Sequence, residues 1–238
     1  MANEGFCFKQ FSIKHDKCAM KVGTDAVLLG AWTSPDNSER ILDIGTGTGI
    51  IALMLAQKSS ANIDAIDIDE NACLQAKENI NNSKWNNKIS VHHTSLQKFS
   101  ENTSAKYDLI ISNPPYFIDC SKATGLERTN ARHADTLPYQ ELLNGVVKLL
   151  SAKGKFYVIL PLKEGELFRD MAEEKKIYLS RLTRVHTRAD KSTEKRWLMQ
   201  FEPERKTFSE DSLTIELDER HNYTEEYKAL TKDYYIAF

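Results

Sequence analysis

The stretch "IISNPPYF" (residues 110–117) contains residues that can recognise a planar amino group. Asn113 follows an apolar run with the composition of a buried strand, and Pro114, Pro115 and Tyr116 come directly after it. Pro115 restricts Pro114 to an extended backbone, so the Pro114 carbonyl oxygen points in a fixed direction. Together with the side-chain oxygen of Asn113, this carbonyl supplies two rigid hydrogen-bond acceptors, and Tyr116 supplies a ring on which a base can stack.

These four residues predict a group transfer to an exocyclic NH₂. Such a nitrogen is a poor nucleophile because its lone pair is delocalised into the ring. Two acceptors that hold both of its hydrogens favour the tetrahedral nitrogen that develops as a new group arrives, which is stabilisation of the transition state by preorganised hydrogen bonds. The structural alternative is a strand ended by prolines, with two aromatic rings in the core. The pattern leaves open whether the acceptor is adenine, another base or a glutamine amide.

A second candidate site is the glycine-rich stretch "LDIGTGTGI", which follows one apolar strand and opens a helix. Gly45, Gly47 and Gly49 allow a tight turn, close approach of a ligand to the backbone, and helix N–H groups that face a carboxylate. In the dinucleotide-binding fingerprint the third glycine comes one position later, where this chain has Ile50. The spacing therefore disfavours a nicotinamide cofactor. Alone, this stretch could also be an ordinary turn.

Acidic residues end the next strand, "AIDID". Asp67 lies about 20 residues after the glycines, where an acidic side chain can accept hydrogen bonds from both hydroxyls of a ribose. Asp69 is expected to cap the following helix. The glycine turn and Asp67 together favour a nucleoside-containing ligand.

The elements that carry these residues alternate in type from Arg40 onward. The strands "RILDIG", "IDAIDI", "KISVHH", "YDLIIS" and "KFYVIL" are separated mostly by helical patterns such as "IIALMLAQK" and "YQELLNGVVKLL", and two further strands follow. This order predicts an α/β fold that is Rossmann-like and doubly wound, with a mostly parallel seven-stranded sheet. The carboxyl ends of its strands would bring the glycine turn, Asp67 and Asn113 to one edge.

We expect residues 1–39 to form an N-terminal extension and residues 40–238 to form the main domain. The extension contains an alternating segment, "GFCFKQFSIKHDKCAM", that predicts a short hairpin. It also contains "TDAVLLGAW", which predicts a helix that Thr24 or Asp25 could cap. The long polar segment after Phe117 is typical of a functional loop.

Composition limits the function classes. The 238 residues include 32 Lys and Arg and 34 Asp and Glu, a net charge of −2, which argues against a protein that coats nucleic acid indiscriminately. Residues 175–206 are locally basic, with ten basic and four acidic side chains (10 − 4 = +6), which indicates contact with phosphates or, alternatively, a solvated loop. The four cysteines and six histidines show no metal-ligand spacing, so no metal is expected. No apolar run is long enough for a membrane span, and we expect a cytoplasmic protein.

The glycine turn and Asp67 resemble those of class I S-adenosylmethionine-dependent methyltransferases. The resemblance implies that the turn holds the methionine end of S-adenosyl-L-methionine, that Asp43 interacts with its amino group and that Asp67 binds its ribose. Members of that class often have an aspartate after the third strand that reads the adenine amino group. This chain has Ser95 and Leu96 there, so adenine contact is expected from the Ser95 hydroxyl and the backbone.

Over nearly its whole length the chain resembles the bacterial tRNA(Val) adenine-N6-methyltransferases. The resemblance is carried by "MKVGTDAVLLGAW", "LDIGTGTGI", "NPPYF", "ERTNAR" and "KRWL". It implies methylation of the adenosine beside the anticodon of tRNA, with Lys21 and Thr24 closing over the cofactor, and we expect a monomer. The residues expected to contact the RNA are Tyr116, Phe117, Arg128, Arg132, Lys191 and Arg196. The alternatives are methylation of guanine N2 in rRNA or of a protein glutamine amide, and a nucleotide-binding module without catalysis.

Overall fold

The structure is a computed structural model that describes residues 5–18, 21–115, 138–190 and 194–238. Its strands are β1 (Gly5–Cys7), β2 (Ser12–Lys14), β3 (Arg40–Ile44), β4 (Asn62–Asp67), β5 (Ile89–His93), β6 (Tyr107–Ser112), β7 (Leu150–Leu160), β8 (Tyr178–Arg188), β9 (Glu194–Glu202) and β10 (Ser209–Glu216). Its helices are α1 (Thr24–Trp32), α2 (Ile50–Lys58), α3 (Glu70–Asn81), α4 (Leu96–Asn102), α6 (Tyr139–Leu149), α7 (Leu162–Glu174) and α8 (Glu225–Thr231).

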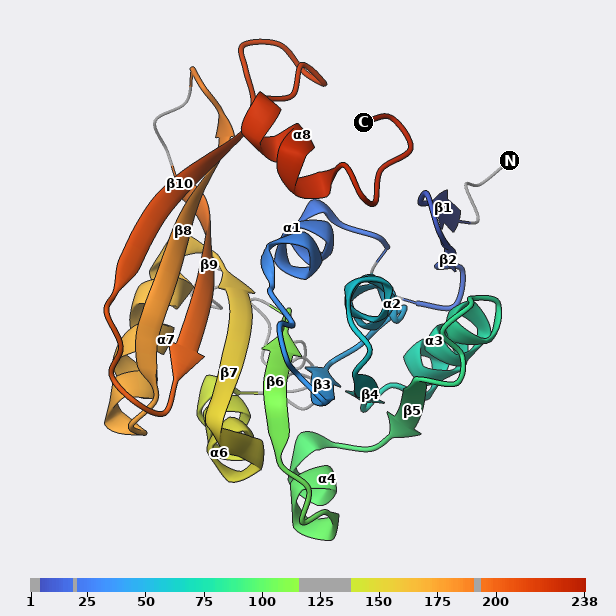
Figure 1. The fold of residues 1–238 in the computed structure, drawn as a ribbon, viewed down its shortest axis with the longest axis vertical. Coiled ribbons are helices and arrows are strands. Elements are labelled where there is room, and N and C mark those ends of the chain that lie inside the picture. The colour runs from blue at the N-terminus through green and yellow to red at the C-terminus, as the bar shows by residue number, and fades with distance from the viewer. Residues whose placement is uncertain (1–4, 19–20, 116–137, 191–193) are drawn as a thin grey trace, which may run out of the picture.

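The main sheet confirms the predicted α/β class (Figure 1). Its strand order is β10-β8-β9-β7-β6-β3-β4-β5, and β7, β6, β3, β4 and β5 are all parallel. The chain winds outward from β3 through β4 to β5, and then from β6 to β7 on the other side of β3. Ligands bind in such sheets at the carboxyl ends of the strands, where the winding direction reverses. Here that point lies between β3 and β6.

The described part of the sheet has eight strands instead of the predicted seven. The additional strand is β10, which pairs in parallel with β8 at the edge of the sheet. Its sequence, "SEDSLTIE", is mostly polar, and only Leu213 is buried. Sequence periodicity did not predict this strand because an edge strand that buries so little lacks a clear apolar alternation.

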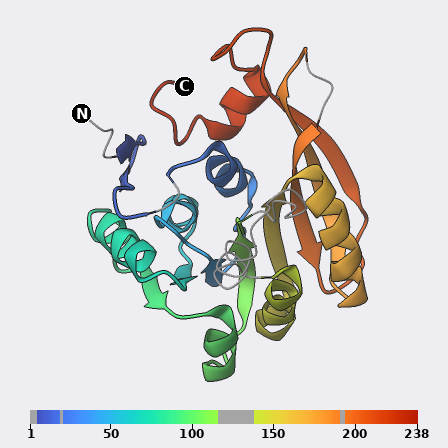
Figure 2. The same cartoon turned by 180° about the vertical axis from the view of Figure 1, so that it is seen from behind.

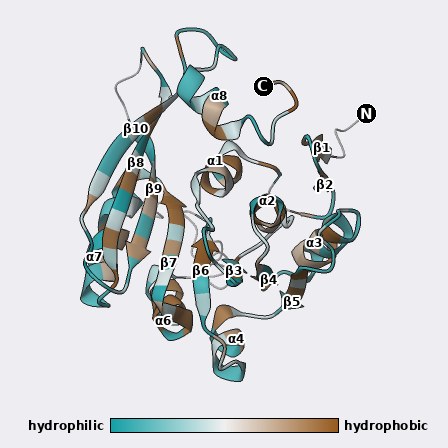
Figure 3. Ribbon diagram, in the orientation of Figure 1, coloured by the Kyte–Doolittle hydropathy of each residue, from teal (hydrophilic) through white to brown (hydrophobic). Residues whose placement is uncertain are grey.

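Helices cover both faces of the sheet, as Figures 1 and 2 show from opposite sides. On β6, Leu109 and Ile111 belong to the core cluster under α1, α2 and α3, whereas Ile110 belongs to the cluster under α4, α6 and α7. Figure 3 shows apolar residues concentrated on the central strands and on the inner sides of these helices. The central strands are therefore buried on both faces, which fixes their carboxyl ends rigidly in space.

The N-terminal segment forms the predicted hairpin, in which Phe6 pairs with Ile13. Helix α1 begins at Thr24, and Gly23 is the N-cap residue without a side-chain cap bond. Thr24 and Asp25 are thus the first two residues of the helix and not its cap, so the expected cap is wrong. The Asp25 carboxylate accepts a hydrogen bond from Arg196 of β9.

Candidate active site

The glycine turn joins β3 to α2 and leaves open space in front of its backbone. Gly45, Gly47 and Gly49 have φ values of 72°, 55° and 81°, in the left-handed region that favours glycine. A Cβ atom at Gly45 or Gly47 would meet no atom within 4 Å, whereas one at Gly49 would lie 3.3 Å from Ala76. The first two glycines therefore keep the backbone accessible to a ligand, and the third allows α2 to pack against α3.

Asp43 lies under this turn with its side chain fully buried. Its Oδ2 accepts a hydrogen bond from Thr46 Oγ1 at 2.7 Å, while its Oδ1 has no hydrogen-bond partner among the described residues. Burial above all, with a contribution from the nearby Asp67, raises the pKa of Asp43 to about 7, and hydrogen bonding from Thr46 and the Ala52 backbone opposes the rise. A buried carboxylate oxygen without a partner is costly, and an ammonium group of a ligand would satisfy it.

Asp67 ends β4 beside the same turn. Its Oδ2 accepts from the Gly47 N–H at 2.8 Å, and its Oδ1 accepts from the Asp69 N–H at 3.0 Å. Each carboxylate oxygen can accept a second bond, so the group retains capacity for two ribose hydroxyls. Asp69 caps α3 as predicted, accepting from the N–H groups of Asn71 and Ala72.

Replacing Asp67 by asparagine is expected to weaken binding of S-adenosyl-L-methionine by about 1.5–3 kcal/mol, because a charged acceptor of hydroxyl bonds becomes neutral. Isothermal calorimetry on the folded variant measures this loss. Asp69→Asn is the matched control, because asparagine caps a helix as well as aspartate does. Equal affinities of both variants and the parent would remove Asp67 from the cofactor site.

The segment before α1 passes close to the glycine turn. The side-chain amide of Asn79 donates to the carbonyls of Lys14 and Thr48, both at 2.9 Å, and so joins the N-terminal segment to the turn. Burial raises the pKa of the Cys18 thiol to about 11, and the negative charge of Asp67 contributes to the rise. Lys21 and Thr24 follow, and both are exposed.

At the end of β5, two residues predicted to contact adenine have structural roles. Ser95 caps α4 and accepts from the Lys98 N–H at 3.3 Å, and Leu96 is 4% exposed in the core. The Leu96 side chain therefore packs in the core, whereas the partly exposed Ser95 hydroxyl accepts the cap bond and keeps its own O–H to donate. Ile68 follows Asp67 and is 59% exposed, so it offers an apolar surface for a flat ring. Sequence reasoning missed Ile68, although an apolar residue directly after a strand-end aspartate was a usable signal.

Asn113 emerges from β6 next to the glycine turn. Ser112, the last residue of β6, pairs in register with Ile44, and its Oγ donates to the Ile44 carbonyl at 3.0 Å. Because Gly45 follows Ile44 and Asn113 follows Ser112, the glycine turn and the predicted acceptor site leave adjacent parallel strands. Asn113 is half-buried, Pro114 is buried and Pro115 is exposed. The other predicted residues of this region, Tyr116, Phe117, Arg128 and Arg132, lie outside the described residues.

The basic segment 175–206 is largely neutralised by carboxylates of the same chain. Most of it belongs to β8 and β9 and not to a loop. Five of its arginines form ion pairs: Arg181 with Asp211, Arg184 with Glu194 and Glu210, Arg188 with Asp190, Arg196 with Asp25, and Arg205 with Glu173. Lys191 lies outside the described residues. The positive charge that this surface offers to RNA is therefore smaller than the sequence count of +6 indicates.

The described residues contain neither a membrane-spanning helix nor a metal-binding cluster. None of the helices there has the length and apolar character that crossing a bilayer requires. No group of three or more His, Cys, Asp or Glu side chains in the described ranges is arranged to hold a metal ion.

Comparisons with known proteins agree on the kind of chemistry. The family model for the methyltransferase small domain matches residues 18–161. The chain is 50% identical over 238 residues to a tRNA1(Val) (adenine(37)-N6)-methyltransferase of Parabacteroides distasonis, covering 99% of each chain. It is 44% identical to the enzyme of that name from Trichodesmium erythraeum, covering 100% of each.

Solved structures share the fold at low sequence identity. A predicted O-methyltransferase from Agrobacterium tumefaciens matches with a TM-score of 0.69 at 16% identity, covering 88% of this chain and 96% of that one. A 16S rRNA N2 G1207 methyltransferase from T. thermophilus, solved with AdoMet and guanosine, matches with a TM-score of 0.54 at 19% identity, covering 83% of this chain and 50% of that one.

Proposed function

Because the chain belongs to the tRNA1(Val) (adenine(37)-N6)-methyltransferase family, we infer that it transfers a methyl group from S-adenosyl-L-methionine to N6 of an adenine in tRNA. The target is the adenosine 3′ of the anticodon of tRNA(Val). Full-length similarity to adenine-N6 enzymes favours adenine over guanine N2 and over a glutamine amide, and it favours catalysis over a module that only binds nucleotides. We propose that the enzyme acts in the cytoplasm as a monomer.

One observation carries this function: the register of β3 and β6. The pairing of Ile44 with Ser112 puts the glycine turn and Asn113 on neighbouring strand ends. A methyl donor held by the turn and an amino group held by Asn113 would therefore meet at one edge of the sheet.

The residues around the glycine turn fit S-adenosyl-L-methionine. The buried Oδ1 of Asp43 would accept from the amino group of the cofactor, the open backbone at Gly45 and Gly47 would hold its methionine end, and Asp67 would hold its ribose. When bound, the cofactor supplies an electrophilic methyl group on a sulfonium. We propose that Lys21, Thr24 and the backbone at Ser95 and Leu96 complete this site, and that residues 1–39 cover it as an extension of the domain formed by 40–238. The bonds of Asn79 to Lys14 and Thr48 support this cover.

We propose that Asn113 and Pro114 act on the acceptor. Their two oxygens would hold the hydrogens of the adenine N6 and stabilise the tetrahedral nitrogen as the methyl group arrives. No dedicated base is needed, because the nitrogen that gains the methyl group becomes acidic and releases a proton to water. Tyr116 and Phe117 would stack on the extruded base, with Pro115 fixing the turn. Arg128, Arg132, Lys191 and Arg196 are proposed to face the RNA backbone.

The test is methyl transfer from labelled S-adenosyl-L-methionine to tRNA(Val) that lacks the modification, followed by nuclease digestion and mass spectrometry. We expect one methyl group on N6 of the adenosine 3′ of the anticodon. Label on guanine, on a protein glutamine, or on no acceptor would contradict the proposed function.

A further inference from the structure

The side-chain amide of Asn79, in the last turn of α3, bonds to two segments of the chain that are far apart in sequence. Its Oδ1 accepts a hydrogen bond from the Lys14 N–H at 2.9 Å, and its Nδ2 donates to the Lys14 carbonyl at 2.9 Å. Nδ2 also donates to the Thr48 carbonyl, again at 2.9 Å. The amide therefore pairs with Lys14 as the backbone of a neighbouring strand would, and it reaches the glycine turn with its second hydrogen.

Burial makes these bonds costly to lose. Asn79 is 2% exposed, so water cannot replace its partners, and the reverse orientation of the amide would place its oxygen against two carbonyl oxygens. The ion pairs of Glu78 with Lys14 and Lys17, in contrast, lie at the surface, where such pairs contribute little. Gln75 accepts from the Lys17 N–H at 3.0 Å, but its amide nitrogen has no partner among the described residues. Asn79 is thus the buried link between the N-terminal segment and the turn.

On the side of the turn, Asn79 fixes the peptide group between Thr48 and Gly49. The carbonyl of this peptide, from Thr48, accepts from Asn79. Its N–H, from Gly49, donates to the Thr46 carbonyl at 2.9 Å. Because both polar groups of this planar unit are bonded, its orientation is fixed. Gly47, one residue before Thr48, has the open backbone that fits the cofactor, so a shift of this peptide would displace the binding surface.

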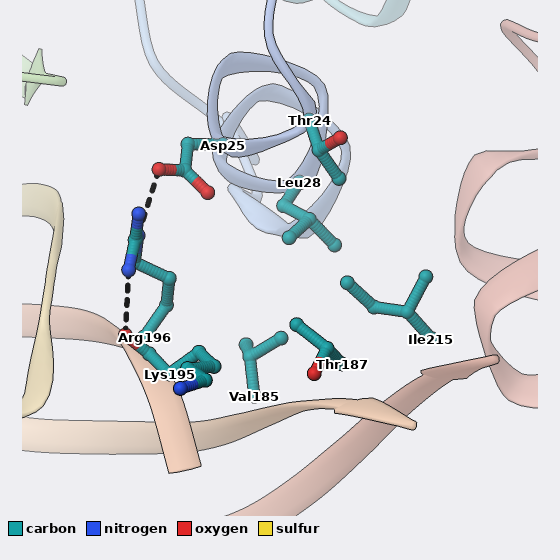
Figure 4. Close-up of a pocket in the computed structure, with 8 residues that line it drawn as sticks. All are labelled: Thr24, Asp25, Leu28, Val185, Thr187, Lys195, Arg196 and Ile215. Atoms are coloured by element: carbon teal, nitrogen blue, oxygen red, sulfur yellow. Dashed lines mark hydrogen bonds and ion pairs between the residues drawn. The ribbon is translucent and has the colours of Figure 1, made fainter. Parts of the chain in front are cut away.

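The N-terminal segment is held on both sides of the turn. Helix α2 lies between α1 and α3 on one face of the sheet, as Figure 1 shows. On the α3 side, Asn79 holds Lys14. On the α1 side, the Asp25 carboxylate accepts from Arg196 Nε at 2.8 Å, beside the carboxyl end of β7 (Figure 4). The segment is therefore fixed at both sides of the N-terminus of α2, where the glycine turn lies.

We propose that Asn79 is a positioning residue that couples the N-terminal segment to cofactor binding. A cofactor held by the turn stabilises the orientation of the Thr48 peptide, which favours the bonds of Asn79 to Lys14 and keeps the N-terminal segment in place. The coupling acts in both directions, because a free-energy link between two sites is reciprocal. The proposal rests on the proposed function, since it requires the turn to bind S-adenosyl-L-methionine. It assigns a role to a residue that acts through the turn and not on the reacting atoms.

Asn79→Ala is expected to raise the dissociation constant for S-adenosyl-L-methionine about tenfold, because the competent arrangement of the turn is then populated less often. Calorimetry on the folded variant measures this loss. Turnover at saturating cofactor and the KM for tRNA should stay near the parent values, since the change does not reach the acceptor site.

Two control variants separate positioning from other effects of the substitution. Asn81→Ala removes an exposed asparagine from the same helix. Ile177→Ala lowers the melting temperature by leaving a cavity in the core on the other face of the sheet. Both controls should keep the parental cofactor affinity. Parental affinity of Asn79→Ala, or an equal loss of affinity in Ile177→Ala, would overturn the positioning role.

Hydrogen exchange of the parent protein, followed by NMR, tests the coupling without a substitution at position 79. Saturating S-adenosyl-L-methionine should slow exchange of the Lys14 N–H about tenfold, because Asn79 is its acceptor. The Phe8 N–H, which bonds to the Phe11 carbonyl within the hairpin, is the control and should exchange at an unchanged rate. In Asn79→Ala, the cofactor should no longer slow exchange at Lys14. Equal slowing at both amides, or slowing at Lys14 that persists in Asn79→Ala, would also overturn the coupling.

Failure of the proposed function has a different signature. The parent protein would then show no binding of S-adenosyl-L-methionine by calorimetry. Failure of the positioning role alone leaves that binding intact in the parent and unchanged by Asn79→Ala.

Discussion

Replacing Asn113 by alanine is expected to lower the turnover of methyl transfer to tRNA by about 10²–10³-fold while leaving cofactor affinity near that of the parent. The change removes one of two preorganised acceptors aimed at the amino group, and removing one such group in other enzymes costs about this much. Cofactor binding should survive because the residues that fit the cofactor lie on β3 and β4, whereas Asn113 follows β6. Single-turnover rates at saturating cofactor and tRNA measure the effect.

Asn87→Ala is the matched control for this experiment. Asn87 is an exposed asparagine in the turn before β5, at the amino end of this parallel strand and therefore at the opposite edge of the sheet from the candidate site. Its replacement should leave turnover unchanged. If Asn113→Ala were as active as the parent, the two-acceptor mechanism would be wrong and "NPPY" would only end a strand.

Replacing Asp43 by asparagine is expected to weaken cofactor binding by about 10²–10³-fold and to stabilise the unliganded protein at neutral pH. The lost affinity follows from removing the buried anion that would pair with the amino group of the cofactor, since truncating one partner of a buried charge pair costs roughly 2–5 kcal/mol. The gained stability follows from removing a fully buried carboxyl group whose Oδ1 lacks a partner among the described residues. Calorimetry and thermal melting measure the two effects. A variant with parental affinity, or with lower stability above pH 7, would contradict this role.

The raised pKa of Asp43 also predicts how the parent protein responds to pH. Its carboxyl group keeps a proton to about pH 7 in the folded state, against a usual value of 3.8 in the unfolded state. Between these values the folded state binds more protons, so the Asp43 contribution to stability falls as pH rises from about 4 to 7 and is constant above that. Cofactor affinity should instead increase as pH rises toward 7. Below pH 7 the Asp43 carboxyl group must lose its proton before it can pair with the amino group of the cofactor, which weakens binding. Calorimetry at pH 6 in two buffers of different ionisation enthalpy would detect the released proton, and its absence would show that Asp43 is already ionised.

The sequence by itself determined the elements that depend on local spacing. Gly45, Gly47 and Asp67 could be placed because a glycine turn and a strand-end acid have a fixed separation in a βαβ unit. Asn113 could be placed at the same edge because parallel strands all present their carboxyl ends together. The fold class followed from the same alternation of strands and helices.

Only the tertiary structure decided which side chains are already used by the protein. In the sequence, the arginines of 175–206 are all candidates for contact with RNA phosphates. In the structure, Arg196 of β9 pairs with Asp25 of α1, which lies 171 positions earlier in the chain and neutralises its charge. The Leu96 side chain is in the core, and Ser95 caps α4 as well as following β5. Counting charges or reading periodicity cannot find such partners, because they are set by strand register and by helix direction, and both depend on packing over the whole chain.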